Sequence, residues 1–371
     1  MAAKKILLLY ISESSGHHCA SIAIENALHS IAPDIQTMNI NCFNYTNPIL
    51  EKVINRAYLG VVKRTPEIWD YLYDNPKVLK RTQKLRAMIH KFNAAKLKVL
   101  LNEFKPNAII CTQAFPCGMI ADYKKSLGLS TPLIGVLTDY APHSYWIYDS
   151  VDKYIVPSKE TGLKLIANGI DPRKIETFGI PVESRFSLFH DKEAIFKKVG
   201  IDPKRPSVLI MGGTQGLGPI KDIIRSIDKS DLDVQAIVAA GTNKKLYSWM
   251  ATKSFKKKVV VLPYADNIDE LMEISTVIIT KPGGITTAEA LCKGLPMLIV
   301  SPLPGQESMN TIFLLNEYVA VKAENPEDVI VVLTELLYNK NKLAIMSERA
   351  RSLAKPDSAV NIARLTMELT R

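Results

Sequence analysis

The feature that most constrains this chain is a repeated alternation between short apolar runs and stretches with helical periodicity. Near-continuous apolar strands that alternate with helices are typical of parallel sheets covered by helices on both faces. The predicted strands form two series, Lys5–Ile11, Asn107–Thr112, Pro132–Thr138 and Lys153–Val156, followed by Ser207–Met211, Val234–Ala239, Val259–Leu262, Thr276–Thr280, Pro296–Val300 and Val319–Lys322. Two such series predict an α/β fold with two doubly wound domains.

The boundary between the two series is expected near Gly179–Glu183, where the first series ends. A charged stretch with helical character, Asp191–Lys198, precedes the second series. A chain of 371 residues is also long for a single hydrophobic core. We therefore expect an N-terminal domain over residues 1–183 and a second domain from residue 184 onward.

Composition narrows the setting in which the chain works. Its five cysteines are scattered and form no C-x-x-C pair, so neither a disulfide framework nor a zinc site is indicated, and a reducing cytosol is expected. No apolar run reaches 18 residues, so we expect no membrane-spanning helix, and we expect no signal peptide either. The net charge of +10 indicates an anionic partner: nucleic acid, anionic lipid or a phosphorylated substrate.

Two glycine-bearing turns of the second series are suited to bind phosphate. The first, Met211–Pro219, contains Gly213 and Thr214 and follows a predicted strand directly. The second, Thr280–Leu291, follows another strand and contains Lys281, Gly283, Gly284 and Thr286. Glycines let backbone amides approach a phosphate closely, and a helix N-terminus adds a partial positive charge. The alternative is a plain glycine-rich connection between a strand and a helix.

Two further groups in this half are suited to bind polyols. Glu289 is expected in the first turn of the helix after Gly284, where its carboxylate could accept hydrogen bonds from the hydroxyls of a ribose. Stabilisation of that turn by the helix dipole is the alternative. The loop Pro302–Asn310 brings Gln306 and Glu307 to a strand's carboxyl end, where open α/β sheets bind ligands, although a solvated turn would look the same.

In the first half, two polar clusters follow predicted strands. His17 and His18 follow Ser12–Gly16, at the expected N-terminus of a helix, where the dipole would lower an imidazole pKa and keep a neutral base near pH 7. Asp139 and His143 lie in Thr138–Trp146 and are expected to face a cleft. A structural role for each group is the alternative.

The segment Lys52–Lys105 holds thirteen Lys and Arg residues against four acidic ones, interleaved with aromatic side chains. This mixture suits docking on an anionic membrane surface, while a solvated helix face is the common alternative and no nucleic-acid-binding signature accompanies it. The residues predicted to contact a membrane, or a substrate held in it, are Trp69, Lys80, Arg81, Tyr145 and Trp146. Asp231-Leu232-Asp233 matches a metal-binding D-x-D pattern but precedes a strand, so we expect a polar turn and no required metal.

The run Ile279–Ala290, together with Pro304-Gly305-Gln306-Glu307, resembles the donor-site signature of the monogalactosyldiacylglycerol synthase and processive diacylglycerol glucosyltransferase group of glycosyltransferase family 28. Supporting similarities run in the same order over most of the chain. They are Thr138-Asp139-Tyr140 with His143 and Trp146, Val151-Asp152-Lys153-Tyr154, and Gly179-Ile180-Pro181-Val182.

The resemblance implies a GT-B fold: two Rossmann-like doubly wound domains facing a cleft. Residues 1–183 would bind the acceptor and the membrane, and residues 184–355 would bind the UDP-sugar. Residues 356–371 would carry a C-terminal helix, Ser358–Leu369, that crosses back to the N-terminal domain.

It also implies an inverting transfer, without metal or other cofactor, of a hexose from a UDP-hexose to diacylglycerol or a glycosyl-diacylglycerol. The protein would act peripherally on the cytoplasmic face of a membrane and would not bind nucleic acid. The diphosphate would lie on Gly213 and Thr214, the ribose on Glu289, and the hexose near Gln306 and Glu307.

His17 matches the family's N-terminal histidine and is a candidate base. The preceding Ser12-Glu13-Ser14-Ser15-Gly16 departs from the family's Asp-Thr-Gly-Gly-Gly, so Asp139 or His143 could take that role instead. The alternatives for function are an N-acetylglucosaminyltransferase acting on an undecaprenyl-linked peptidoglycan precursor, a UDP-sugar epimerase, and an inactive nucleotide-sugar-binding regulator.

Overall fold

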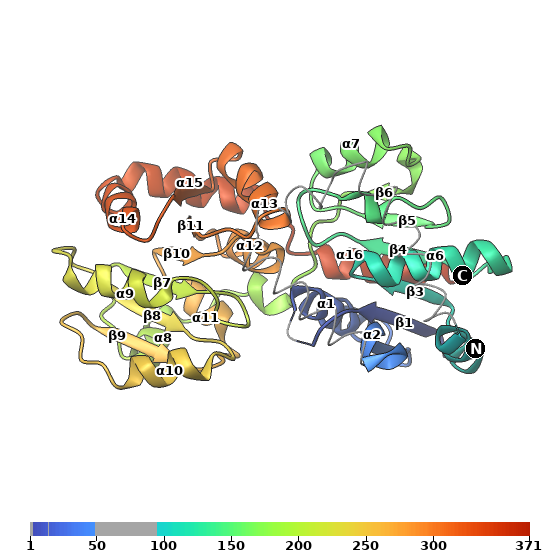
Figure 1. The fold of residues 1–371 in the computed structure, drawn as a ribbon, viewed down its shortest axis with the longest axis horizontal. Coiled ribbons are helices and arrows are strands. Elements are labelled where there is room, and N and C mark those ends of the chain that lie inside the picture. Colours follow the sequence, from blue (N-terminus) through green and yellow to red (C-terminus); the bar gives the residue numbers. More distant parts are fainter. Residues whose placement is uncertain (1–2, 14, 49–94) are drawn as a thin grey trace. The chain divides into compact units, whose positions relative to one another are not determined.

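The computed structural model describes residues 3–13, 15–48 and 95–371, which form two compact units (Figure 1). Unit 1 comprises Met1–Glu183, Pro304–Gln306 and Asp357–Arg371, and unit 2 comprises Ser184–Leu303 and Glu307–Pro356. Most of the basic segment Lys52–Lys105 lies outside the described residues, and so do the predicted membrane contacts Trp69, Lys80 and Arg81.

Unit 1 is built on a sheet of six strands, all parallel, in the order β2-β1-β3-β4-β5-β6. The strands are β1 (Lys5–Tyr10), β2 (Gln36–Asn41), β3 (Ala108–Cys111), β4 (Leu133–Val136), β5 (Lys153–Ile155) and β6 (Ile175–Glu176). The sequence predicted four of these. It missed the two edge strands because β2 has a polar sequence and stays partly exposed, while β6 has two residues only.

Helices cover both faces of this sheet, as the apolar strands require. Along β1, Leu7 and Leu9 pack with one hydrophobic cluster, whereas Ile6 and Leu8 pack with another on the opposite face. The helical elements of unit 1 are α1 (Gly16–Ile31), α2 (Cys42–Thr46), a helical stretch over residues 95–104, α6 (Ala114–Leu127), η1 (Ser144–Trp146), α7 (Lys159–Ala167), η2 (Pro172–Lys174) and α16 (Ser358–Leu369).

The C-terminal helix α16 belongs to unit 1, although unit 2 precedes it in the chain. It packs against α1, and its Ala359 and Ala363 share a buried cluster with Ala23 and Ala27 of α1. These small side chains let the two helix backbones approach closely. The Ser358 hydroxyl donates a buried hydrogen bond of 2.8 Å to the Gly179 carbonyl, which fixes the start of the helix. The predicted return of this helix to the N-terminal domain is confirmed.

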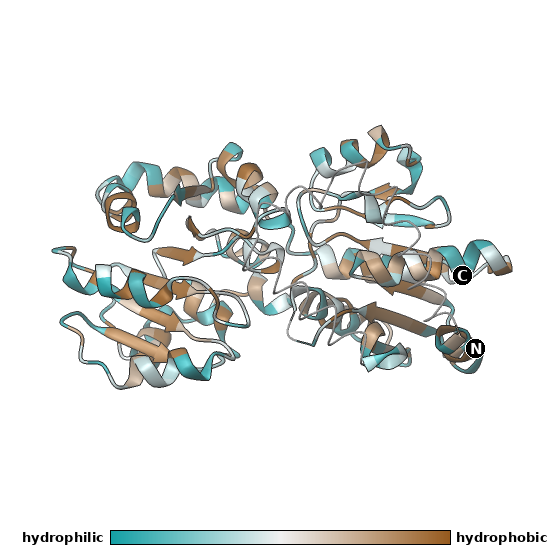
Figure 2. Ribbon diagram, in the orientation of Figure 1, coloured by the Kyte–Doolittle hydropathy of each residue, from teal (hydrophilic) through white to brown (hydrophobic). Residues whose placement is uncertain are grey.

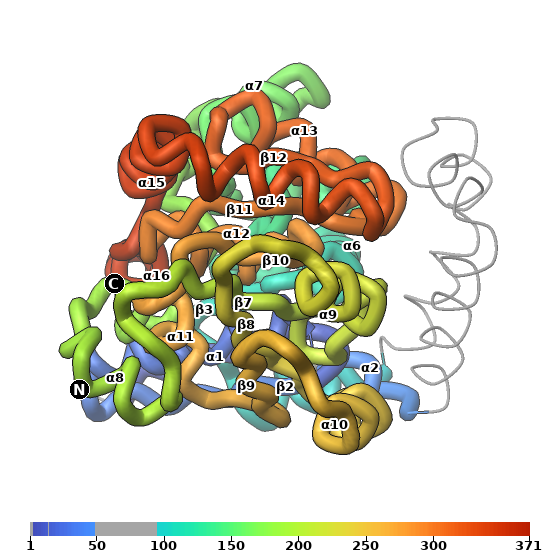
Figure 3. Tube along the Cα trace, turned by 90° about the vertical axis from the view of Figure 1, so that its left-hand side faces the viewer, coloured from blue at the N-terminus to red at the C-terminus, as the bar shows by residue number. Residues whose placement is uncertain are grey.

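Unit 2 has its own parallel sheet of six strands, in the order β12-β11-β10-β7-β8-β9, and Figure 3 shows them in that order from top to bottom. The strands are β7 (Ser207–Met211), β8 (Gln235–Ala239), β9 (Val259–Leu262), β10 (Val277–Thr280), β11 (Met297–Val300) and β12 (Ala320–Ala323). This is the Rossmann strand order, in which strands are added toward one edge of the sheet from β7 to β9 and toward the other edge from β10 to β12.

The helices of unit 2 follow from amphipathic sequences. In α9, Ile220, Ile223, Ile224 and Ile227 recur at helical spacing, and all four are buried. The elements are η3 (Ser184–Ser187), α8 (Lys192–Val199), α9 (Ile220–Lys229), α10 (Lys244–Ala251), α11 (Ile268–Glu273), α12 (Gly284–Cys292), α13 (Gln306–Asn316), α14 (Asp328–Tyr338) and α15 (Lys340–Leu353). Figure 2 shows hydrophobic strands inside each unit and hydrophilic residues on the outer helices. Among the described helices, none combines the length and apolar composition that a membrane crossing requires.

Candidate functional site

In unit 2, the two predicted phosphate-binding turns leave neighbouring strands at the same edge of the sheet. Strands β7 and β10 pair directly, with Met211 opposite Thr280 at their carboxyl ends. The turn that begins at Gly212 therefore lies beside the turn Lys281–Gly283. This is the point where the strand order reverses, and open α/β sheets bind ligands in the crevice that such a reversal creates.

The glycines of these turns fall into two groups. A Cβ on Gly212 would lie 1.8 Å from the Leu217 carbonyl oxygen, and one on Gly216 would lie 2.1 Å from the Ala240 oxygen. These two glycines are therefore required by the turn itself. A Cβ on Gly213 or Gly283 would meet no atom within 4 Å. Open space lies beside these two backbone positions, where a ligand could approach them.

The helices that follow both turns begin without a capping side chain. Gly283 precedes α12 and Pro219 precedes α9, whereas Asp191 caps α8 and Asn243 caps α10 in the same unit. The first amides of a helix have no intrahelical acceptor, so those of Gly284, Ile285 and Thr286 can donate to an anion.

Thr287, in the first turns of α12, adds an unsatisfied polar group. Its side chain is 1% exposed, and its hydroxyl makes no hydrogen bond within the part of the chain that the structure describes. A buried hydroxyl without a partner is costly, and such a group in a native fold is often completed by a ligand or an ordered water. The sequence analysis did not single out Thr287, because its burial depends on packing that no local pattern specifies.

Glu289 lies in the second turn of α12, since the helix begins at Gly284 and its first turn holds no acidic residue. The expectation that Glu289 occupies the first turn was therefore wrong. The dipole effect decreases rapidly beyond the first turn, so it does not explain a carboxylate at this position. The polyol-binding interpretation of Glu289 remains a prediction.

Lys281 and Glu307, predicted as separate ligand contacts, bind each other. Their side chains form an ion pair of 2.8 Å and are 11% and 15% exposed. The second carboxylate oxygen of Glu307 accepts a hydrogen bond of 2.7 Å from the Leu303 amide. Buried Asn310 of α13 donates to the Pro282 carbonyl at 3.0 Å. Helix α13, which Gln306 opens, therefore holds the Lys281–Gly283 turn in place.

In unit 1, His17 lies at the switch point of the other sheet, between β1 and β3. Its Nδ1 is 2.9 Å from the Thr112 carbonyl oxygen, while the Thr112 hydroxyl donates to the His17 carbonyl at 2.8 Å. A carbonyl oxygen can only accept, so Nδ1 carries the proton of the neutral ring. The Thr138 hydroxyl lies 2.9 Å from the same Nδ1. Nε2 consequently keeps its lone pair and can accept a proton.

Burial dominates the electrostatics of this cluster. It lowers the pKa of His17 to about 4, against the Thr112 hydrogen bond, which raises it. Burial, and then the charge of nearby His17, lower the pKa of His143 to about 4. Both rings are neutral at pH 7, as the sequence predicted for His17, but burial rather than the helix dipole is the main cause.

The other predicted residues of unit 1 surround this cluster or lie apart from it. Half-buried Asp139 directly follows Thr138 in the chain. His18 instead stacks on Tyr10, with ring centroids 4.3 Å apart, which favours a structural role. Trp146 is 5% exposed in the hydrophobic core of unit 1, and Tyr145 stacks on Phe115. The core position of Trp146 does not present its ring to a membrane.

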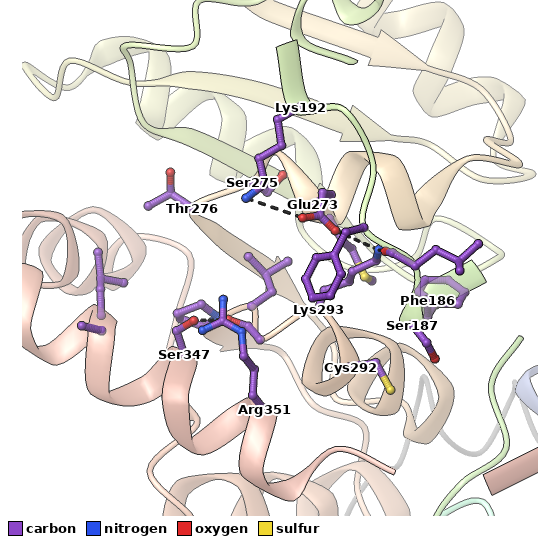
Figure 4. A pocket seen from close by; sticks show the side chains of 18 residues that line it. Phe186, Ser187, Lys192, Glu273, Ser275, Thr276, Cys292, Lys293, Ser347 and Arg351 are labelled. Carbon is purple, nitrogen blue, oxygen red and sulfur yellow. Dashed lines mark hydrogen bonds and ion pairs between the residues drawn. The ribbon is translucent and has the colours of Figure 1, made fainter. Parts of the chain in front are cut away.

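A cavity of about 420 Å³ lies elsewhere in unit 2 (Figure 4). Its lining includes Thr276 and Pro296, which directly precede β10 and β11, and the ion pair of Lys293 with Glu273, 2.9 Å long. It therefore opens at the amino-terminal edge of the sheet and contains no residue of the glycine turns. Asp233 of the D-x-D sequence is exposed and lies 3.5 Å from Arg205, in a turn before β8.

Comparison with known proteins places this geometry in a family. Residues 17–182 match the family model of monogalactosyldiacylglycerol (MGDG) synthase, and residues 207–362 match that of the glycosyltransferase family 28 C-terminal domain. The processive diacylglycerol beta-glucosyltransferases of Bacillus licheniformis and Bacillus subtilis are each 28% identical over 362 residues. These alignments cover 96% of this chain and 92% and 93% of those proteins.

Solved structures agree on the fold. Acinetobacter baumannii MurG has a TM-score of 0.61 at 14% identity, covering 98% of this chain and 99% of that one. The glycotransferase of kitacinnamycin has a TM-score of 0.63 at 12% identity, with full coverage of both chains. Anabaena HepE in complex with UDP-glucose has a TM-score of 0.57 at 14% identity, covering 98% of each chain.

Two Rossmann-like units with glycine turns at a switch point define a glycosyltransferase of the GT-B type. The chain belongs to glycosyltransferase family 28 and carries the N-terminal domain of the MGDG synthase group. The fold and the family inferred from the sequence motifs are therefore confirmed.

The two buried histidines predict how stability depends on pH. The unfolded chain protonates a histidine near pH 6.5, whereas folded His17 and His143 stay neutral down to about pH 4. Between pH 6.5 and 5 the unfolded state binds more protons than the folded state. The free energy of unfolding should therefore decrease as the pH is lowered, by up to about 1.4 kcal/mol per pH unit for each histidine. Urea unfolding across this range measures the slope. A His17→Asn, His143→Asn double variant should show a shallower slope, and an unchanged slope would contradict the assignment.

Proposed function

We propose that this glycosyltransferase transfers a hexose from a UDP-hexose to diacylglycerol or a glycosyl-diacylglycerol at a membrane surface, with inversion and without a metal. The pairing of β7 with β10 carries this proposal, because it sets two uncapped helix N-termini and two open glycine positions side by side. The names of the Bacillus relatives, aligned over nearly the full chain, support the lipid acceptor.

The donor's diphosphate fits the turns at Gly213, Thr214 and Gly283. The amides at the start of α12 donate to its oxygens, and the helix dipoles offset its charge. Lys281 adds a cation that Glu307 holds in a fixed position, so little reorganisation is needed when charge develops on the leaving UDP. Protein groups thus take over the charge compensation that a metal ion supplies in other transferases.

Glu289 and the start of α13 complete the donor site in this proposal. The Glu289 carboxylate accepts hydrogen bonds from the two ribose hydroxyls. Gln306 and Glu307, the first residues of α13, bind the hydroxyls of the hexose. Because one carboxylate oxygen of Glu307 already accepts from Leu303 and the other from Lys281, its direction is set before the sugar binds.

His17 acts as the general base. Its Nε2 accepts the proton of the acceptor hydroxyl while that oxygen bonds to the anomeric carbon from the face opposite UDP, and the bond to the diphosphate breaks. A buried imidazolium is unfavourable, as the low pKa of His17 indicates, so the protonated ring requires a nearby anion. Asp139 supplies that charge in our proposal.

Direct assay tests the proposed function. The protein is incubated with labelled UDP-glucose, UDP-galactose or UDP-N-acetylglucosamine and detergent-dispersed diacylglycerol, in buffer containing a chelator, and the lipid product is identified by mass and linkage. We expect a β-linked hexosyl-diacylglycerol from UDP-glucose or UDP-galactose. Transfer only to an undecaprenyl-linked acceptor, offered in a parallel reaction, would instead indicate an N-acetylglucosaminyltransferase. Epimerisation of the donor without transfer would indicate a UDP-sugar epimerase.

Gly283→Ala tests the donor site. The backbone at Gly283 has φ −65° and ψ 140°, which alanine adopts freely, and its Cβ would enter open space. We therefore expect nearly unchanged thermal stability but at least about tenfold weaker UDP binding by calorimetry, equal to about 1.4 kcal/mol. Gly212→Ala is the contrasting variant, since its Cβ would collide with the Leu217 carbonyl and should destabilise unit 2. Normal UDP affinity in Gly283→Ala would place the diphosphate elsewhere.

His17→Ala tests the base. Removal of a general base lowers turnover by about 10²–10⁴. We expect a loss of kcat in this range, with UDP affinity unchanged because the proposed contacts with UDP itself, Gly213, Thr214, Gly283 and Glu289, lie in unit 2. His18→Ala is the matched control and should keep kcat within a few-fold of the wild-type value. Near-normal turnover of the His17 variant would transfer the role to Asp139 or His143.

A further inference from the structure

The positive charge of this chain is concentrated in two segments. Of its 47 Lys and Arg residues, thirteen lie in residues 52–105 and six in residues 241–258, whereas only four of its 37 acidic residues lie in the first segment and none in the second. The rest of the chain holds 28 basic and 33 acidic residues and is therefore slightly acidic. The second segment, which includes α10, belongs to unit 2, and none of its lysines is among the donor-site residues proposed above.

Cations from α9 and from the segment after α10 lie around one indole ring. Trp249 of α10 has Lys221 and Arg225 of α9 over its ring, each 4.9 Å from the centroid, and Lys253 at 5.7 Å. Each cation is attracted by the ring, yet the three positive charges repel one another. Asp222 offsets the charge of Arg225 at 3.1 Å, whereas Lys221 and Lys253 form no ion pair with another described residue. An anion at the outer surface would relieve the repulsion that remains.

Further exposed lysines lie close to Trp249 in the chain. Lys244, Lys245, Lys253, Lys256 and Lys258 are all exposed, and none forms an ion pair with another described residue. Helix α10 turns Leu246 and Met250 into the core, while Tyr247 stays 36% exposed beside the lysines. Lysines with an exposed tyrosine and a partly buried tryptophan are the composition of a surface that contacts lipid head groups.

We propose that this α9–α10 surface, formed by Lys221, Arg225, Lys244, Lys245, Tyr247, Trp249, Lys253, Lys256 and Lys258, docks on an anionic phospholipid bilayer. The choice of a bilayer rests on the proposed function, because a diacylglycerol acceptor resides in a membrane. The charge itself is complementary to the phosphates of anionic lipids.

Vesicle binding by the full chain tests this proposal. The variant Lys253→Glu, Lys256→Glu, Lys258→Glu reverses three exposed charges outside the donor site. Since each lysine near an anionic surface contributes about fivefold to binding, we expect at least about tenfold weaker binding to phosphatidylglycerol-containing vesicles. Binding of the wild type should weaken as ionic strength rises.

The matched control is Lys197→Glu, Lys204→Glu, Lys340→Glu, which changes the net charge equally at exposed lysines outside the α9–α10 surface. It should bind vesicles at least several-fold more tightly than the first variant. Trp249→Leu keeps every charge and should bind more weakly than the wild type. Equal losses in both triple variants would mean that net charge alone acts, and would overturn the proposal. The proposal would also be overturned if the first triple variant kept vesicle binding but lost binding to a single-stranded oligonucleotide.

Transfer to detergent-dispersed diacylglycerol separates this inference from the proposed function. The first variant should retain wild-type activity there and lose activity only on acceptor embedded in anionic vesicles. If the proposed function is wrong, neither the wild type nor the triple variants transfer hexose in either assay, yet the difference in vesicle binding between the two variants persists. If the docking surface is wrong, transfer in detergent persists and the two triple variants bind vesicles alike.

Discussion

The pairing of β7 with β10 is the constraint on which the candidate donor site depends. Two parallel strands that are neighbours in the sheet but far apart in the chain must end at the same edge, so their turns meet there. Each turn leads into a helix whose first amides have no capping side chain. A stable fold does not require two such helix ends to be adjacent, whereas binding of a diphosphate benefits from both at once.

Sheet assembly also brings distant residues together around His17. The Thr112 carbonyl, at the end of β3, fixes the tautomer of a ring carried by the helix after β1. The sheet therefore determines which nitrogen is available for chemistry. Burial keeps the ring neutral but also disfavours the protonated state that a general base must pass through. A base in this environment is effective only when an anion stabilises that state during the reaction.

Sequence periodicity was sufficient for the architecture because apolar strands buried on both faces leave a strong local signal. The strands Ser207–Met211 and Val259–Leu262 and the helix Ser358–Leu369 have the bounds that the sequence predicted. The polar edge strand Gln36–Asn41 lacked that signal, because only part of its surface is buried.

The site was predictable at the level of its loops and less so at the level of contacts. Glycine turns after strands predicted Gly213 and Gly283 as phosphate contacts, and the structure leaves open space beside both positions. The pairing of Lys281 with Glu307 joins residues 26 positions apart, and the contact of His17 with Thr112 joins residues 95 apart. Such contacts depend on how the sheet is assembled, which local sequence does not encode. Residues 49–94, which contain Trp69, Lys80 and Arg81, lie outside the described structure.

The position of α16 has a consequence for the biosynthesis of this chain. Ala359, Ile362 and Ala363 cover the face of the first sheet that contains Ile6 and Leu8. The ribosome makes them only after every strand of unit 2 has been synthesised. Unit 2 can therefore complete its core during translation, while α1 alone covers part of this apolar face of the earlier-made unit 1 and the rest stays exposed. Chaperone dependence of the nascent chain should consequently reside in its first half.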